Sequence, residues 1–159
     1  MSVWRRVAIE KFPKLREEVE RSESLGMLWT QLYLRFLRAH EEPVDLEMIR
    51  RCYEYAWWCF NQSRNQDVTD KVGMGFYENL PTDRLVRQRI AEHLTTEQFG
   101  KVAGYLAYFL GPEKFGQFSE EFFKERSKQI EQMHHRQRGR TKWVGWRGRR
   151  GQVPRSVQF

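Results

Sequence analysis

The side chains with the clearest chemical pattern lie at the C-terminal end of the chain. Residues 132–159, here called the basic tail, contain no acidic side chain. Guanidinium groups can bind phosphate through paired hydrogen bonds, and indole rings can stack on bases. The tail combines two tryptophans with eight basic residues, namely Trp143 and Trp146 with Arg136, Arg138, Arg140, Lys142, Arg147, Arg149, Arg150 and Arg155.

We therefore predict that the basic tail binds a polyanion, and nucleic acid is one candidate. Three other interpretations stay open. The tail could act as a solubilising segment, dock on an acidic face of its own body, or dock on an acidic protein partner.

The charge of the chain is divided unevenly along its length. Residues 1–125 carry 18 basic and 20 acidic side chains, whereas residues 126–159 carry ten basic side chains and one acidic side chain. The formal net charge of +7 therefore belongs to the C-terminal end. This division predicts a helical domain over residues 1–131, followed by the tail over residues 132–159.

Within the body, no set of residues matches a known pattern for catalysis or metal binding. Glu131 and His134 have the i, i+3 spacing used in di-metal helical bundles, but such bundles need two of these motifs and further glutamates. The sequence holds one copy, next to a basic segment that would repel a cation. We expect no metal, no cofactor and no catalytic residues, and hence a protein that is not an enzyme.

The remaining histidines and the two cysteines favour structural roles. His40 is expected at a helix end, where the dipole favours a cation, and His93 on the polar side of its helix. Cys52 and Cys59 are seven residues apart in a helical pattern, about 10 Å along the axis, which is too far for a disulfide. We expect reduced core thiols in a cytoplasmic protein.

Two features of the body could bind a partner. Arg84 and Arg87 belong to its only basic cluster and can share one helix face; a solvated helix side is the simpler explanation, and a phosphate site is the other. Trp58 lies off the main apolar stripe of its helix, so it is either a surface anchor for a partner or part of the core. We take Trp58, Arg84 and Arg87 as candidate partner-binding residues.

Apolar side chains recur with the period of an α-helix throughout the body, and no long stretch alternates with period two. Caps and prolines divide the pattern into segments near residues 3–12, 13–21, 25–40, 46–60, 66–80, 84–93, 96–110 and 112–133. The last segment becomes polar near Arg126, so we expect its second half to project. The predicted fold is an all-α compact bundle of about eight short helices in antiparallel pairs, with a basic C-terminal tail.

The apolar runs are too short to cross a bilayer, which needs about 18 residues. The longest run, Val102 to Leu110, reaches about half that length. The N-terminus also lacks the apolar core of a secretory signal. We expect no membrane association and a cytoplasmic location.

Two short stretches carry a resemblance to a known group of proteins. They are Glu10-Lys11-Phe12-Pro13-Lys14-Leu15 and the segment from Val72 to Leu80, Val-Gly-Met-Gly-Phe-Tyr-Glu-Asn-Leu. Together they resemble small, all-helical bacterial proteins of uncharacterised function that look like the immunity proteins of polymorphic toxins. The resemblance covers about residues 3–123, and Lys14 and Tyr77 depart from its pattern. It implies a helical fold and a protein partner, with no catalytic residues.

The leading hypothesis is therefore a non-enzymatic protein-binding domain, of the immunity type, that blocks a toxin or another partner by surface contact. The alternative is a nucleic-acid-binding protein that acts through the basic tail. A basic tail suits a basic nuclease toxin poorly, because such a toxin favours an acidic inhibitor.

Overall fold

A computed structural model describes residues 1–62 and 64–144, with side chains described as far as residue 136. Over these residues the chain forms eight α-helices and two 3-10 helices and contains no strand, so the all-α prediction is confirmed. In chain order the elements are α1 (Val3–Lys11), η1 (Pro13–Leu15), α2 (Arg16–Arg21), α3 (Leu25–Ala39), α4 (Leu46–Phe60), α5 (Gln66–Gly75), η2 (Tyr77–Asn79), α6 (Arg84–His93), α7 (Thr96–Ala107) and α8 (Gly111–Val144).

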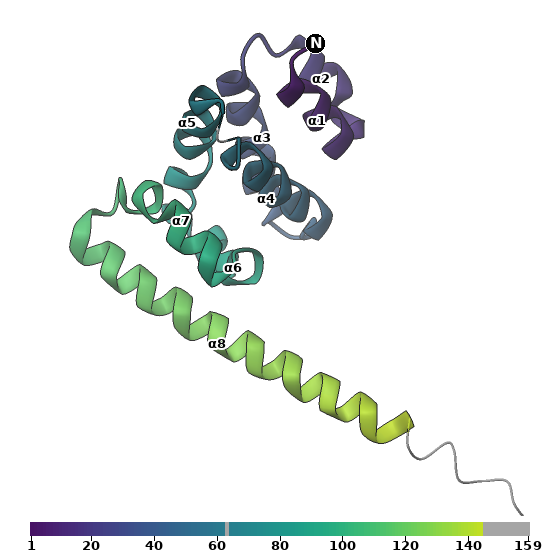
Figure 1. Ribbon diagram of the computed structural model, residues 1–159, viewed down its shortest axis with the longest axis vertical. Helices are drawn as coiled ribbons and strands as arrows, with labels where there is room; N and C mark the ends of the chain where they lie inside the picture. The colour runs from purple at the N-terminus through teal and green to yellow at the C-terminus, as the bar shows by residue number, and fades with distance from the viewer. Residues whose placement is uncertain (63, 145–159) are drawn as a thin grey trace, which may run out of the picture.

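The helices follow one another through the body in three groups (Figure 1). Helices α1 and α2 pack together at one end, and α1 also packs on α4. In the middle, α3, α4 and α5 pack on one another, and α7 reaches this group through α5 and η2. At the other end, α8 lies against both α6 and α7.

Side-chain caps place the starts of four helices where the sequence predicts them. Ser24 accepts a hydrogen bond from the backbone of α3, Asp45 from α4 and Asp83 from α6. Thr95 and Gln98 form a reciprocal capping box at the start of α7. Each cap satisfies backbone N–H groups that lack partners within the helix.

The fifth predicted segment, residues 66–80, divides into two elements because of a close approach to the core. The backbone at Gly75 passes so near Trp29 that a Cβ atom there would lie 2.8 Å from the Trp29 Cβ. Helix α5 ends at this glycine, and η2 follows after Phe76. The prediction of one helix continuing to Leu80 is therefore wrong.

The seventh helix is also shorter than predicted. Helix α7 ends at Ala107, and the chain then turns through Tyr108–Leu110 into α8. Phe109, which the periodicity assigns to a buried face, is 59% exposed. The apolar period of the sequence continues past the end of α7, but residues 108–110 form a turn and not a helix, so the period no longer indicates which side chains face the core.

Two aromatic clusters hold the bundle together. In the middle group, the Trp29 ring is fully buried and packs 5.2 Å from both Tyr55 and Phe76. At the other end, Phe99 of α7 packs 4.1 Å from Phe122 of α8. Aromatic pairs at such separations stabilise a fold beyond the area they bury. The second cluster fixes the first half of α8 on the body.

Helix α8 is 34 residues long and continues well beyond the helices that support it (Figure 1). Its second half runs away from the body, as the more polar composition of the helix from about Arg126 onward predicts. The helix also crosses the predicted boundary between residues 131 and 132 without a break. The described helix thus carries the first part of the basic tail as far as Val144.

Candidate functional site

A groove lies between α6 and the first half of α8. It has a volume of about 450 Å³, and Ile90, Ala91, Phe118 and Phe122 supply its apolar lining. All four side chains are at least nine-tenths buried. Charged and amide side chains from both helices surround this lining, namely Arg84, Arg87, Gln88, Glu121, Lys124 and Glu125. An apolar centre with a polar rim is the usual anatomy of a protein-binding surface.

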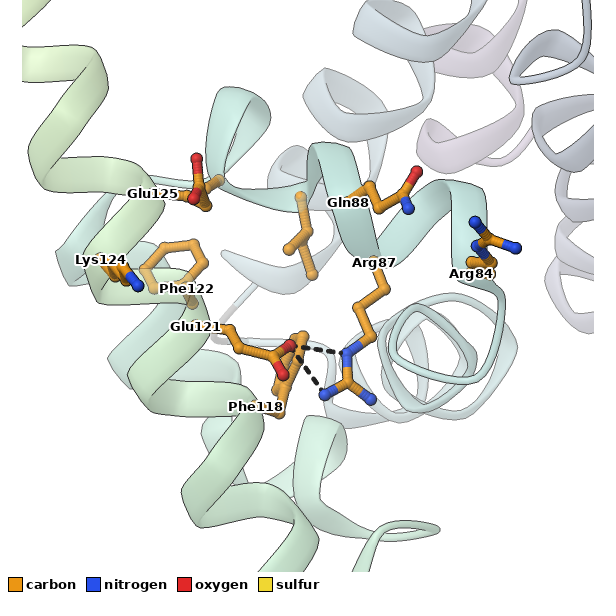
Figure 2. Close-up of a pocket in the computed structure, with 10 residues that line it drawn as sticks. Arg84, Arg87, Gln88, Phe118, Glu121, Phe122, Lys124 and Glu125 are labelled. Carbon is orange, nitrogen blue, oxygen red and sulfur yellow. Dashed lines mark hydrogen bonds and ion pairs between the residues drawn. The ribbon is translucent and has the colours of Figure 1, made fainter.

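Arg87 connects the two sides of this groove (Figure 2). Its Nε and Nη2 atoms donate hydrogen bonds of 3.0 and 2.8 Å to Oε2 of Glu121. Its guanidinium carbon also lies 5.4 Å from the centre of the Phe118 ring. The ion pair remains open to solvent, with the Glu121 side chain 59% exposed, so it contributes little to stability. Both groups therefore stay accessible to a partner.

The other cations at the rim, Arg84 and Lys124, have no ion-pair partner in the described part of the chain. Arg84 is the first residue of α6, three residues before Arg87, and lies away from Glu121 (Figure 2). Among the described residues, neither Arg84 nor Lys124 lies within ion-pair distance of a carboxylate, whereas Glu125 accepts a hydrogen bond from Lys128. Within the described part of the chain, the rim thus offers two unpaired positive charges, whereas its two carboxylates, Glu121 and Glu125, are each paired with a cation.

Arg126 ties α8 to the end of α6 at the point where α8 leaves the body. Its Nη1 atom donates a hydrogen bond of 3.1 Å to the carbonyl oxygen of Ala91. Ala91 lies in the last turn of α6, where carbonyl groups lack partners within the helix and a cation is favoured. This contact fixes one end of the groove.

The structure separates the predicted partner-binding residues. Arg84 and Arg87 both line the α6–α8 groove, but Trp58 is not among its lining residues. Trp58 is half-buried, and its ring lies parallel to Tyr55 with 6.1 Å between the ring centres. It therefore packs against the core of the middle group.

The residues of the basic tail are described only in part. Arg136 is exposed on α8. Arg138, Arg140, Lys142 and Trp143 belong to the same helix by their backbone. The other predicted polyanion-binding residues, Trp146, Arg147, Arg149 and Arg150, lie outside the described residues.

The two histidines of the body are more enclosed than the sequence predicts. His93, expected on a polar helix side, is half-buried and stacks on Tyr53, and burial lowers its pKa to about 4. His40 does end α3, but it is 4% exposed and its Nδ1 atom lies 2.9 Å from the Phe36 carbonyl oxygen. Burial also lowers the pKa of His40, so the expected cation at this helix end is disfavoured.

Cys52 and Cys59 are buried free thiols, as predicted. Burial raises the pKa of both thiols, that of Cys59 to about 12, which makes them unreactive at neutral pH. Glu131 and His134 are exposed on the projecting half of α8. The described part of the chain brings no cluster of three or more potential metal ligands together.

The helices of the described residues include none with the length and apolar character required to cross a membrane. In comparisons with known proteins, no family model, no curated protein and no solved structure matches this chain.

Sequence reasoning identified the arginines of the groove but missed its other half. Phe118 and Phe122 follow the apolar period of α8, which by itself predicts only that they face the core. Glu121 lies between them on the same helix and gives no sequence signal of its own. The spacing of Arg84 and Arg87 places both on one face of α6 and so indicates this side of the groove. The helix that forms the opposite side, α8, is identified only by its packing in the structure.

Proposed function

We propose that the protein acts by binding another protein at the groove between α6 and α8, and that it catalyses no reaction. The observation that carries this proposal is the arrangement around Arg87. An apolar lining lies beside an accessible arginine, and two further cations at the rim have no partner among the described residues. Arginine is one of the residues enriched at binding hot spots, which lie in well-packed pockets.

The finer form of the proposal is an immunity-type protein that blocks a cognate toxin in the cytoplasm. It is supported by the resemblance of residues 3–123, which implies a protein partner and no catalytic residues. The unpaired cations at the rim indicate that the surface of this partner is acidic where it meets the groove.

Co-expression with the proteins encoded by neighbouring genes, followed by pull-down, tests the proposal. We expect wild-type protein to retain a partner that the double variant Arg84→Glu/Lys124→Glu loses. The matched control is Arg64→Glu/Lys114→Glu, which changes the charge equally at exposed sites outside the groove. A partner that binds the groove variant as well as wild type contradicts the proposal.

Nucleic-acid binding through the basic tail is the second candidate function. It is favoured by the course of α8, which carries residues 132–144 of the tail away from a body whose net charge is slightly negative. The test compares full-length protein with the variant Arg147→Gln/Arg149→Gln/Arg150→Gln in binding single-stranded oligonucleotides over a range of salt concentrations. Removing three phosphate contacts should lower the slope of log affinity against log salt by about two. Equal slopes exclude this function for these residues.

A further inference from the structure

A second groove lies in a different part of the molecule, between η1, the end of α3 and the start of α4. Its volume is also about 450 Å³, and it shares no lining residue with the α6–α8 groove. Phe12 and Ala39 form the buried part of its lining, and the half-buried Leu15 and Met48 extend the apolar surface.

Basic side chains outnumber acidic ones around this second groove. Lys14, Arg35, Arg38 and Arg51 line it, together with two acidic residues, Asp45 and Glu47. This basic cluster is absent from the sequence pattern because its members come from three separate segments, and the excess is local, since the body as a whole carries more acidic than basic residues. An apolar cleft with a positive rim attracts negatively charged ligands and raises their local concentration.

The two acidic side chains are already engaged in local contacts. Asp45 caps α4 and accepts a hydrogen bond of 3.0 Å from the backbone N–H of Met48. Glu47 accepts hydrogen bonds from Arg50 and Arg51, which lower its pKa to about 2. Their negative charges are therefore held by groups of α4 itself.

The four basic side chains divide into an anchored pair and an unpaired pair. Arg35 is held by Glu18, and Arg51 by Glu47 and the carbonyl oxygen of Lys11. Lys14 and Arg38 are exposed, and neither has an ion-pair or side-chain hydrogen-bond partner among the described residues. Two cations beside an apolar lining are thus left for a ligand.

We propose that this second groove binds an acidic, apolar peptide segment of a partner protein, with an apolar side chain in the cleft and carboxylates on Lys14 and Arg38. The lining favours a peptide over a nucleic acid, which requires stacking surfaces and a longer basic track. The basic tail of this chain has the same sign of charge as the rim and is therefore excluded by repulsion. The inference is independent of the α6–α8 groove.

The test uses full-length protein and a short fluorescein-labelled peptide of alternating glutamate and leucine, followed by fluorescence anisotropy. We expect the variant Lys14→Gln/Arg38→Gln to bind the peptide roughly tenfold more weakly than wild type, since each exposed charge contributes a few-fold. The control Arg64→Gln/Lys114→Gln should bind as wild type does. Thermal melts verify that each variant is folded.

A further variant separates the groove from the basic tail. Arg147→Gln/Arg149→Gln/Arg150→Gln should retain the peptide, and the effect of Lys14→Gln/Arg38→Gln should persist in its background. The proposal is overturned if wild type does not bind the peptide, or if the tail variant alone abolishes binding. It is also overturned if an oligothymidylate displaces the peptide in a manner that requires Lys14 and Arg38, because the groove would then be a polyanion site.

Discussion

The imidazole ring of His93 lies almost parallel to the phenol ring of Tyr53, with 4.7 Å between their centres and 13° between their planes. This stack joins the last turn of α6 to the middle of α4. Tyr53 is 5% exposed, and no hydrogen-bond partner of the Tyr53 hydroxyl or of His93 Nε2 is found among the described residues. Protonation of His93 would place a charge in an enclosed, apolar contact.

Stability should therefore fall in mild acid. Burial, followed by the charges of His40 and Arg89, lowers the pKa of His93 from 6.5 to about 4, so the unfolded chain binds its proton first as the pH falls. The stabilisation is complete above pH 6.5 and is lost as the pH falls towards the folded-state pKa. We expect the titration of His93 to lower the free energy of unfolding by roughly 2–3 kcal/mol over this pH range.

Chemical denaturation at a series of pH values measures this effect. His93→Phe keeps an aromatic ring against Tyr53 and removes the titrating group, so its unfolding free energy should vary less with pH. His134→Phe, at an exposed position on α8, should leave the pH dependence of wild type unchanged. An unaltered pH profile for His93→Phe argues against this account.

The Arg87–Glu121 pair should couple weakly. Its members remain partly open to solvent, and exposed pairs contribute roughly 0.2–1 kcal/mol. A double-mutant cycle with Arg87→Ala and Glu121→Ala, followed by urea denaturation, gives the coupling free energy. The more exposed pair Glu17–Arg21 on α2 provides the comparison and should couple less strongly. A coupling energy well above this range would show that the pair is structural.

Gly73 should tolerate no side chain. A Cβ atom there would lie 2.1 Å from the ring of Tyr105, whose hydroxyl is fixed by Asp70. We expect Gly73→Ala to destabilise the fold by about 1–3 kcal/mol, as overpacking does. Gly104→Ala is the control, because its Cβ meets no atom within 4 Å on α7, and it should stabilise by about 0.5–1 kcal/mol. Thermal or urea denaturation distinguishes the two, and similar effects would contradict the close approach.

Phe122 should anchor α8 to the body. It is 2% exposed and stacks on Phe99, so Phe122→Ala should lower the free energy of unfolding by about 3–5 kcal/mol. Phe109→Ala removes the same side chain from an exposed position and should change stability far less. In Phe122→Ala, the hydrogen-exchange rates of the α8 amides should increase more than those of the α3 and α4 amides. Equal increases in all three helices would indicate that α8 does not unfold as a separate unit.

The helix starts could be predicted from sequence because caps act locally. Asp45, Asp83 and the Thr95–Gln98 box bond to backbone groups within three residues, so short-range patterns contain the necessary information. The end of α5 could not be predicted, because it depends on the approach of Gly75 to Trp29 from a different helix. Local sequence patterns contain no information about such contacts between residues that are distant in the chain.

The same distinction explains the outcome for the candidate site. The sequence predicts Arg84 and Arg87 as partner-binding residues because one helix face holds both. Glu121, more than thirty residues away, completes the groove only when α8 folds back along α6. His93 was misplaced for the same reason, since Tyr53 of α4 covers the side of α6 that the sequence predicts to be polar.

Because α8 is continuous, it sets a fixed distance between the body and the end of the helix. From Arg126, which is bonded to Ala91, the helix extends to Val144 over about 27 Å at a rise of 1.5 Å per residue. A stiff connection of this length suits only partners whose own contact points match the span, and it penalises smaller ones. For the binding sites proposed above, it follows that a partner able to span about 27 Å can engage the groove and the tail together, whereas two small ligands bind independently.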